Sequence, residues 1–130
     1  MKKSLILIFL FACMFSLHAQ YKYKGFIKEK AYIAGKNEGT ISRDEILNAS
    51  ELVLEDSVKN KYKIISFKMT IVVPGKNIIE IANSSGGKIN DAMKDALKDA
   101  TSSTKVILEY IKCSGKGGIY SIYPFTLEIK

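Results

Sequence analysis

The chain has 130 residues, with 20 basic residues, 13 acidic residues, one histidine and two cysteines. This length fits one globular domain with a single core, and the scarcity of histidine and cysteine excludes most metal sites and most nucleophile–histidine catalysis. The net charge of +7 is scattered along the chain, so it predicts a solvated surface. A basic balance could suit nucleic acid, but the export pattern at the start of the chain argues against a nucleic-acid partner.

The start of the chain has the pattern of an export signal. Two lysines precede an apolar run over residues 5–17, and the motif LHA at 17–19 supplies a small residue for cleavage. The run is shorter than the ~20 residues of a spanning helix. We therefore expect residues 1–19 to be a signal peptide, and residues 20–130 to be exported, without a transmembrane anchor, to the periplasm or the extracellular space.

A second interpretation of the leader is a lipoprotein signal. Residues 10–13, LFAC, resemble a lipobox, in which cleavage would leave Cys13 as a lipidated first residue. Cleavage after residue 19 instead removes His18 and Cys13, so that Cys113 alone remains and no intramolecular disulfide can form. We expect Cys113 to be a buried apolar side chain, because no histidine remains to activate it. The sequence therefore predicts no catalytic residue, no cofactor and no metal site.

Strands and one short helix are predicted in the first half of the mature chain. Residues 21–24 alternate tyrosine and lysine, and residues 26–34 continue as a first strand at a sheet edge. Ser42 stands three residues before a glutamate, the spacing of a capping box, which predicts a helix over 43–48. A short strand follows over 51–55.

The clearest alternation of apolar and polar residues runs from residue 63 to 73. One face of this strand is predicted to enter the core and consists of Ile65, Phe67, Met69, Ile71 and Val73. The turn signal PGKN follows and predicts a hairpin with a strand over 78–82.

The second half of the chain is predicted to hold the longer helix and a second hairpin. Residues 88–100 change to a helical period with Asn90 as the N-cap. Strands return over 105–113 and 119–130 around the turn SGKGG, and Pro124 predicts an edge or a bulge because it cannot donate to a ladder. About six strands with one longer connecting helix predict a mainly β chain, with a minor α contribution, folded as an antiparallel β-sandwich.

Several motifs of residues 39–130 together resemble the C-terminal domain of the gliding-motility protein GldM, from the type IX secretion machinery. They are ISRDEIL at 41–47, LVL at 52–54, YKIISFKM at 62–69, SSGGKIN at 84–90, VILEYIK at 106–112 and FTLEIK at 125–130. The resemblance implies an immunoglobulin-like β-sandwich over 39–130, preceded by a strand or arm over 20–38. It also implies protein partners in the cell envelope and is compatible with a homodimer. The chain departs from the family at Lys116, where an acidic residue commonly precedes the glycine of the turn.

The expected function is that of an exported, non-enzymatic interaction or structural module of the cell envelope, linked to type IX secretion or gliding. The alternative is a small module that binds a glycan or another envelope polymer, although tryptophan, a favoured platform for sugars, is absent. Tyrosine combines apolar area with a polar tip and is favoured at interfaces. The residues expected to contact a partner lie near the mature N-terminus and in the glycine turn: Tyr21, Lys22, Tyr23, Lys24 and Lys116.

Overall fold

The computed structural model describes residues 22–83 and 85–130, and within these ranges the chain is mainly β, with nine strands and two helices. The observed structure therefore confirms the predicted mainly β fold class, while the immunoglobulin-like topology stays a prediction. The signal peptide expected over 1–19, the lipidation alternative at Cys13 and the contact predicted at Tyr21 lie outside the described residues.

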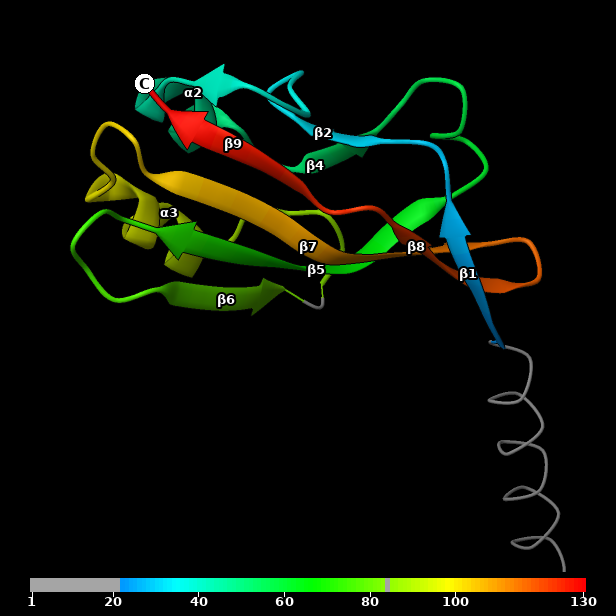
Figure 1. Ribbon diagram of the computed structural model, residues 1–130. Helices are drawn as coiled ribbons and strands as arrows, with labels where there is room; N and C mark the ends of the chain where they lie inside the picture. Colours follow the sequence, from blue (N-terminus) through cyan, green and yellow to red (C-terminus); the bar gives the residue numbers. More distant parts are fainter. Residues whose placement is uncertain (1–21, 84) are drawn as a thin grey trace, which may run out of the picture.

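A seven-stranded sheet forms the larger layer (Figure 1). Five of its strands are neighbours in the order β1 (Lys22–Ile27), β8 (Gly118–Ile122), β7 (Lys105–Gly115), β5 (Lys63–Val72) and β6 (Ile79–Asn83). Two strands share the edge of β7 that faces away from β5. β8 pairs with the second half of β7, and β9 (Phe125–Ile129) pairs with its first half. The short strand β3 (Thr40–Ile41) pairs with β9.

Both predicted hairpins are confirmed, since β5 pairs antiparallel with β6, and β7 with β8. Two pairs differ from the antiparallel sheet that the sequence predicts, because β1 runs parallel to β8 and β3 parallel to β9. Both parallel pairs join segments far apart in the chain, and no turn motif between them reports on their direction.

The second layer combines a small sheet with the two helices. β2 (Ala31–Ile33) pairs antiparallel with β4 (Leu52–Leu54), while α2 (Arg43–Asn48) and α3 (Asp91–Lys98) contact one another and α3 packs against β5 and β6. The single first strand predicted over 26–34 is therefore wrong. The chain leaves the main sheet after β1 and crosses to the second layer before β2, so one segment supplies a strand to each layer.

Both helices begin at the predicted caps. The Ser42 side chain accepts a hydrogen bond from the backbone of Glu45 at 3.1 Å, and the Asn90 side chain accepts one from Met93 at 2.9 Å. Each cap satisfies a donor that the first helical turn leaves without an intrahelical partner. Met93 and Leu97 then lie one turn apart on the fully buried face of α3.

The core lies between the two layers. Phe67, Met69 and Ile71 are buried as predicted, and so is Cys113. Ile65 is only half-buried, and Ile64 enters the core in its place. The pairing of β5 with β7 shifts on both sides of Ser66, which changes the strict alternation at the start of β5.

A bulge in β7 sets the position of Tyr110. The register pairs Ser66 with Lys112 and Lys68 with Glu109, so that two residues of β7, Tyr110 and Ile111, lie opposite the single residue between them on β5. Tyr110 takes a left-handed backbone conformation with φ 51°, which is uncommon for a residue with a side chain. This arrangement keeps Ile111 fully buried and leaves Tyr110 on the outer face, 65% exposed.

Candidate binding surface

Four large aromatic side chains lie exposed on the outer face of the main sheet and its β1 edge, and we call them the aromatic face. They are Tyr23, Phe26, Tyr110 and Tyr123, each 54–65% exposed. The rings of Phe26 and Tyr123 stack with their centroids 4.5 Å apart and an angle of 21° between their planes. Exposed aromatic groups gathered on one face of a domain are typical of a binding surface.

Tyr110 belongs to a network in which every charge has a partner. The Lys68 ammonium lies 4.8 Å from the centroid of the Tyr110 ring and forms ion pairs with Glu80 at 3.0 Å and Glu109 at 3.4 Å. Glu109 also accepts a hydrogen bond of 2.8 Å from Thr70. The hydrogen bond with Glu80 is the main cause that raises the pKa of Lys68. We call this group the Lys68 network.

Tyr23 belongs to a second network, in which a lysine ammonium again lies over a tyrosine ring. The Lys112 ammonium lies 4.6 Å from the centroid of the Tyr23 ring and donates a hydrogen bond of 2.7 Å to the Ser121 hydroxyl. The hydroxyl groups of Tyr23 and Ser121 are 2.9 Å apart and hydrogen-bonded. Among the described residues, no carboxylate pairs with Lys112. We call this group the Lys112 cluster.

The parallel pairing of β1 with β8 brings the predicted contact residues of both segments together. Lys22 lies opposite Gly118, where a side chain on the glycine would overlap the carbonyl of Lys22. The end of Lys24 lies against Gly117 of the turn that also carries Lys116, and the Lys116 carbonyl accepts a hydrogen bond of 2.6 Å from Tyr120. Glycine at these positions therefore allows the close approach of the lysine-rich strand to the turn.

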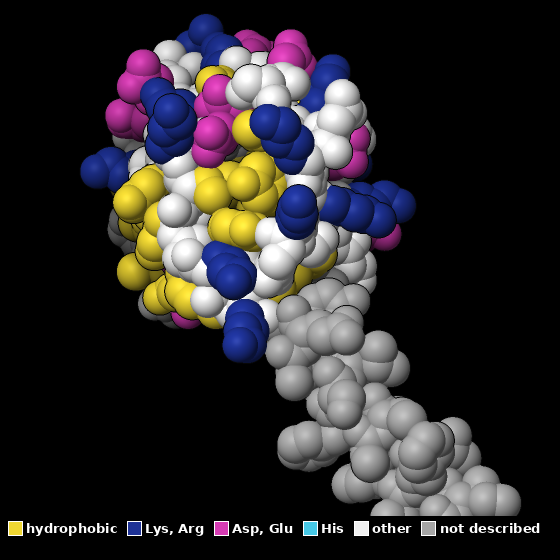
Figure 2. Space-filling model, turned by 90° about the vertical axis from the view of Figure 1, so that its right-hand side faces the viewer, with side chains coloured by type: hydrophobic (Ala, Val, Ile, Leu, Met, Phe, Trp, Pro, Cys, Tyr) yellow, Lys and Arg dark blue, Asp and Glu magenta, His cyan; other side chains and the backbone are white. Residues whose placement is uncertain are grey.

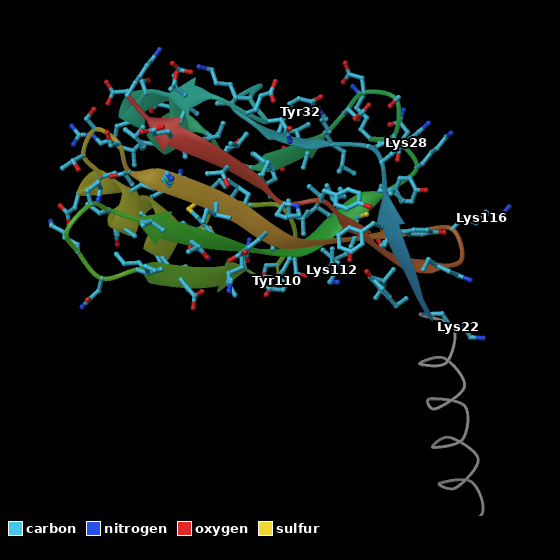
Figure 3. All side chains as sticks on the ribbon, in the orientation of Figure 1. Lys22, Lys28, Tyr32, Tyr110, Lys112 and Lys116 are labelled. Carbon is cyan, nitrogen blue, oxygen red and sulfur yellow. The ribbon has the colours of Figure 1, made fainter. Side chains whose placement is uncertain are left out.

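This end of the molecule is rich in lysine (Figures 2 and 3). Figure 2 shows lysine side chains around and between apolar ones, with acidic side chains mostly toward the top of the view. Figure 3 places Lys22 and Lys28 at the two ends of β1, Lys116 at the nearby turn, and Lys112 beside Tyr110. Residues 22–30 contain four lysines and one glutamate, and residues 110–122 contain two lysines and no acidic residue.

The structure thus brings together the predicted residues Lys22, Tyr23, Lys24 and Lys116, although sequence reasoning missed other members of the surface. The missed residues are Phe26, Tyr110, Lys112, Ser121 and Tyr123. One signal in the sequence could have identified Tyr110 as a surface residue. The buried positions of β7 change phase after Leu108, since the next inward residue is Ile111 and not residue 110, and such a phase change indicates a bulge.

Other parts of the described chain offer less chemistry. An open depression of about 530 Å³ lies between β4, the start of β5 and the segment 85–88, and includes the SGGK sequence before α3. The Cys113 thiol is buried, and burial raises its pKa to about 11. In residues 22–83 and 85–130, no three His, Cys, Asp or Glu side chains are grouped closely enough to hold a metal ion.

Comparison with known proteins assigns no family. A scan against models of protein families finds no match, and no curated protein matches the sequence. The resemblance to the GldM domain therefore stays a prediction. In the part of the chain that the structure describes, neither helix is long and apolar enough to cross a membrane.

Proposed function

We propose that this chain is an exported, non-enzymatic module that binds a protein partner in the cell envelope through the aromatic face. The observation that carries the proposal is the gathering of four exposed rings from β1, from β7 and from the link between β8 and β9 on one surface. A partner that covers these rings removes apolar area from water, and tyrosine contributes this area together with a hydrogen-bonding hydroxyl. The envelope location rests on the predicted signal peptide, and a link to secretion or gliding rests on the GldM resemblance.

The geometry of the aromatic face suits a protein interface. Its rings are fixed by contacts before any partner arrives, because Phe26 stacks on Tyr123, while Tyr23 and Tyr110 are each held beside a lysine. Pre-ordered aromatic side chains lose little conformational entropy on binding. The non-enzymatic assignment rests on the scarcity of catalytic residue types, and Cys113 is a poor nucleophile because its thiol is buried and its pKa is raised.

Envelope crosslinking with paired variants tests the proposal. The tagged chain is crosslinked in its native envelope, and the captured proteins are identified by mass spectrometry. The double variant Phe26→Ala with Tyr110→Ala should lose most of the proteins captured by the wild type. The matched control is Ile78→Ala, which removes an apolar side chain of 61% exposure before β6, at the opposite end of the sheet.

Equal capture by the double variant and the control would contradict a role for the aromatic face. Loss of binding to isolated envelope polymer, with no change in captured proteins, would instead favour the glycan-binding function. The stacked pair Phe26–Tyr123 is the feature that such a polymer would use, because flat stacked rings suit the faces of sugars.

A further inference from the structure

The geometry points to the Lys112 cluster as the anchor for a carboxylate of the protein partner, and we propose that the partner presents an acidic segment flanked by apolar side chains. This inference rests on the proposed function and names the chemistry of its partner. It is argued from the hydrogen-bond donors of the cluster, from its contrast with the Lys68 network and from the charges around it.

The cluster has more hydrogen-bond donors than acceptors for them. A lysine ammonium has three donors, and Lys112 uses one of them on Ser121 among the described residues. The bond between Tyr23 and Ser121 consumes one of their two hydroxyl protons, whichever group donates. One hydroxyl proton and two ammonium protons therefore remain for an acceptor, and a carboxylate offers two oxygens with several acceptor positions.

The Lys68 network contains a similar lysine–tyrosine pair, but its lysine already has carboxylate partners. Lys68 and Lys112 each lie within 5 Å of a tyrosine centroid on the same face of the sheet. Lys68 has Glu80 and Glu109 as partners, while Lys112 is half-buried with a hydroxyl as its hydrogen-bond acceptor. A half-buried ammonium gains from an opposite charge, because part of its hydration is already lost.

The surrounding charge favours an anion from outside the chain. Lys22, Lys28 and Lys116 are exposed at the end of the molecule that carries β1 (Figure 3), and Lys24 is exposed on β1 itself. None of these four lysines forms an ion pair within the described ranges. Positive potential of this kind steers an acidic partner and fixes its register. The aromatic face next to the cluster favours a protein segment over a free anion, since a free anion would leave the apolar area of the four rings uncovered.

A titration followed by NMR tests the anchor. The ¹⁵N-labelled chain of residues 20–130, which includes the whole described core, is titrated with a soluble peptide that carries glutamates next to phenylalanines. A twin peptide with glutamine in place of every glutamate is the matched probe. The glutamate peptide should shift the amide signals of Tyr23, Lys112 and Ser121 and bind about tenfold more tightly than its twin.

Two variants separate the anchor from general electrostatics. Lys112→Met keeps the aliphatic stem and should weaken binding of the glutamate peptide about tenfold, to the level of the glutamine twin. Lys105→Met removes an exposed charge from the other end of β7 and should leave the affinity within about twofold of the wild type. Thermal melts of both variants confirm that they fold.

Three results would overturn the anchor. They are equal affinity for the two peptides, equal loss in the Lys105 and Lys112 variants, and equal shifts of the cluster signals by inorganic phosphate or phosphatidylglycerol vesicles. The last result would assign the site to phosphate groups. The proposed function fails separately, because it is tested by the loss of envelope partners in the Phe26 and Tyr110 double variant, which keeps Lys112.

Discussion

Lys68 and Lys112 each lie over a tyrosine ring on the same outer face, but their electrostatic surroundings differ. Lys68 forms ion pairs with Glu80 and Glu109 from the strands on either side of it. Lys112 lies between Tyr23 and the Ser121 hydroxyl, with lysine-rich segments nearby. The first arrangement is complete within the described chain, and the second leaves donors for an external acceptor.

The difference shows how one sheet face can serve both stability and binding. Strands β5, β6 and β7 are joined by antiparallel ladders, so that their charges meet as cross-strand pairs. At the other edge, β1 contributes lysines and aromatic residues but no acidic residue. The bulge at Tyr110 lies between the two regions, and the Tyr110 ring lies beside Lys68.

The largest expected effect comes from a core residue opposite the bulge that separates the two regions. Phe67 is 2% exposed and lies opposite the bulge of β7. Phe67→Ala should lower the free energy of unfolding by about 3–5 kcal/mol, because it removes a buried ring and leaves a cavity. Urea denaturation measures the loss. Ile78→Ala, at an exposed position, should change stability by less than about 0.5 kcal/mol, and equal effects of the two variants would contradict the placement of Phe67.

The next effect concerns the backbone at the boundary between the two regions. Tyr110→Gly should be more stable than Tyr110→Ala by about 1 kcal/mol, because both remove the ring but only glycine tolerates the left-handed conformation without strain. Tyr123 has no such conformation, so Tyr123→Gly should be less stable than Tyr123→Ala. Denaturation of the four variants gives both differences, and the same order at both positions would exclude strain at Tyr110.

A smaller difference separates the two lysines. Lys68→Met should lower the melting temperature more than Lys112→Met, because it leaves two carboxylates near one another without their cation, whereas the second change leaves one hydroxyl without a donor. High salt should reduce the difference in melting temperature between the two variants, because it screens the repulsion between the two glutamates. Equal melting temperatures at low salt would show that the two networks contribute alike to stability.

The smallest effect concerns Cys113, which follows Lys112 but lies on the opposite, buried face. Burial raises the pKa of its thiol from 9.0 to about 11, so the folded chain should resist a thiol reagent at pH 8 until it unfolds. The thiol therefore stays protonated to a higher pH in the native state than in the unfolded state. Its contribution to stability is therefore complete below pH 9 and declines as the pH rises toward 11.

Cys113→Ala should remove that part of the pH dependence, which urea denaturation at pH 8 and pH 10 can measure. Rapid labelling of the folded wild type at pH 8 would instead show that β7 opens locally beside the Lys112 cluster.

Local signals in the sequence predicted local structure well. The capping box at Ser42 and the cap at Asn90 both begin helices, and the two glycine-containing turns both join hairpins. In each case the interacting groups are a few residues apart, so that spacing and residue type fix the geometry. The buried state of Phe67 and Cys113 also follows from their apolar neighbours.

The candidate surface was predicted only in part. Lys22, Tyr23 and Lys24 were selected from their alternation, and Lys116 from its glycine turn. Their proximity to one another depends on the parallel pairing of β1 with β8, which joins residues about a hundred positions apart. Tyr110 was missed because a bulge reverses the face of a residue that simple alternation places inward.

The sequence by itself determined the mainly β class, the caps, the hairpins and most of the apolar core, because these depend on periodicity and on contacts between near neighbours. Only the tertiary structure decided that β1 joins the main sheet beside β8, that Tyr110 faces outward, and that Lys112 lacks the carboxylates that Lys68 has. These features depend on strand order and register, which are set by packing of the whole chain between its two layers.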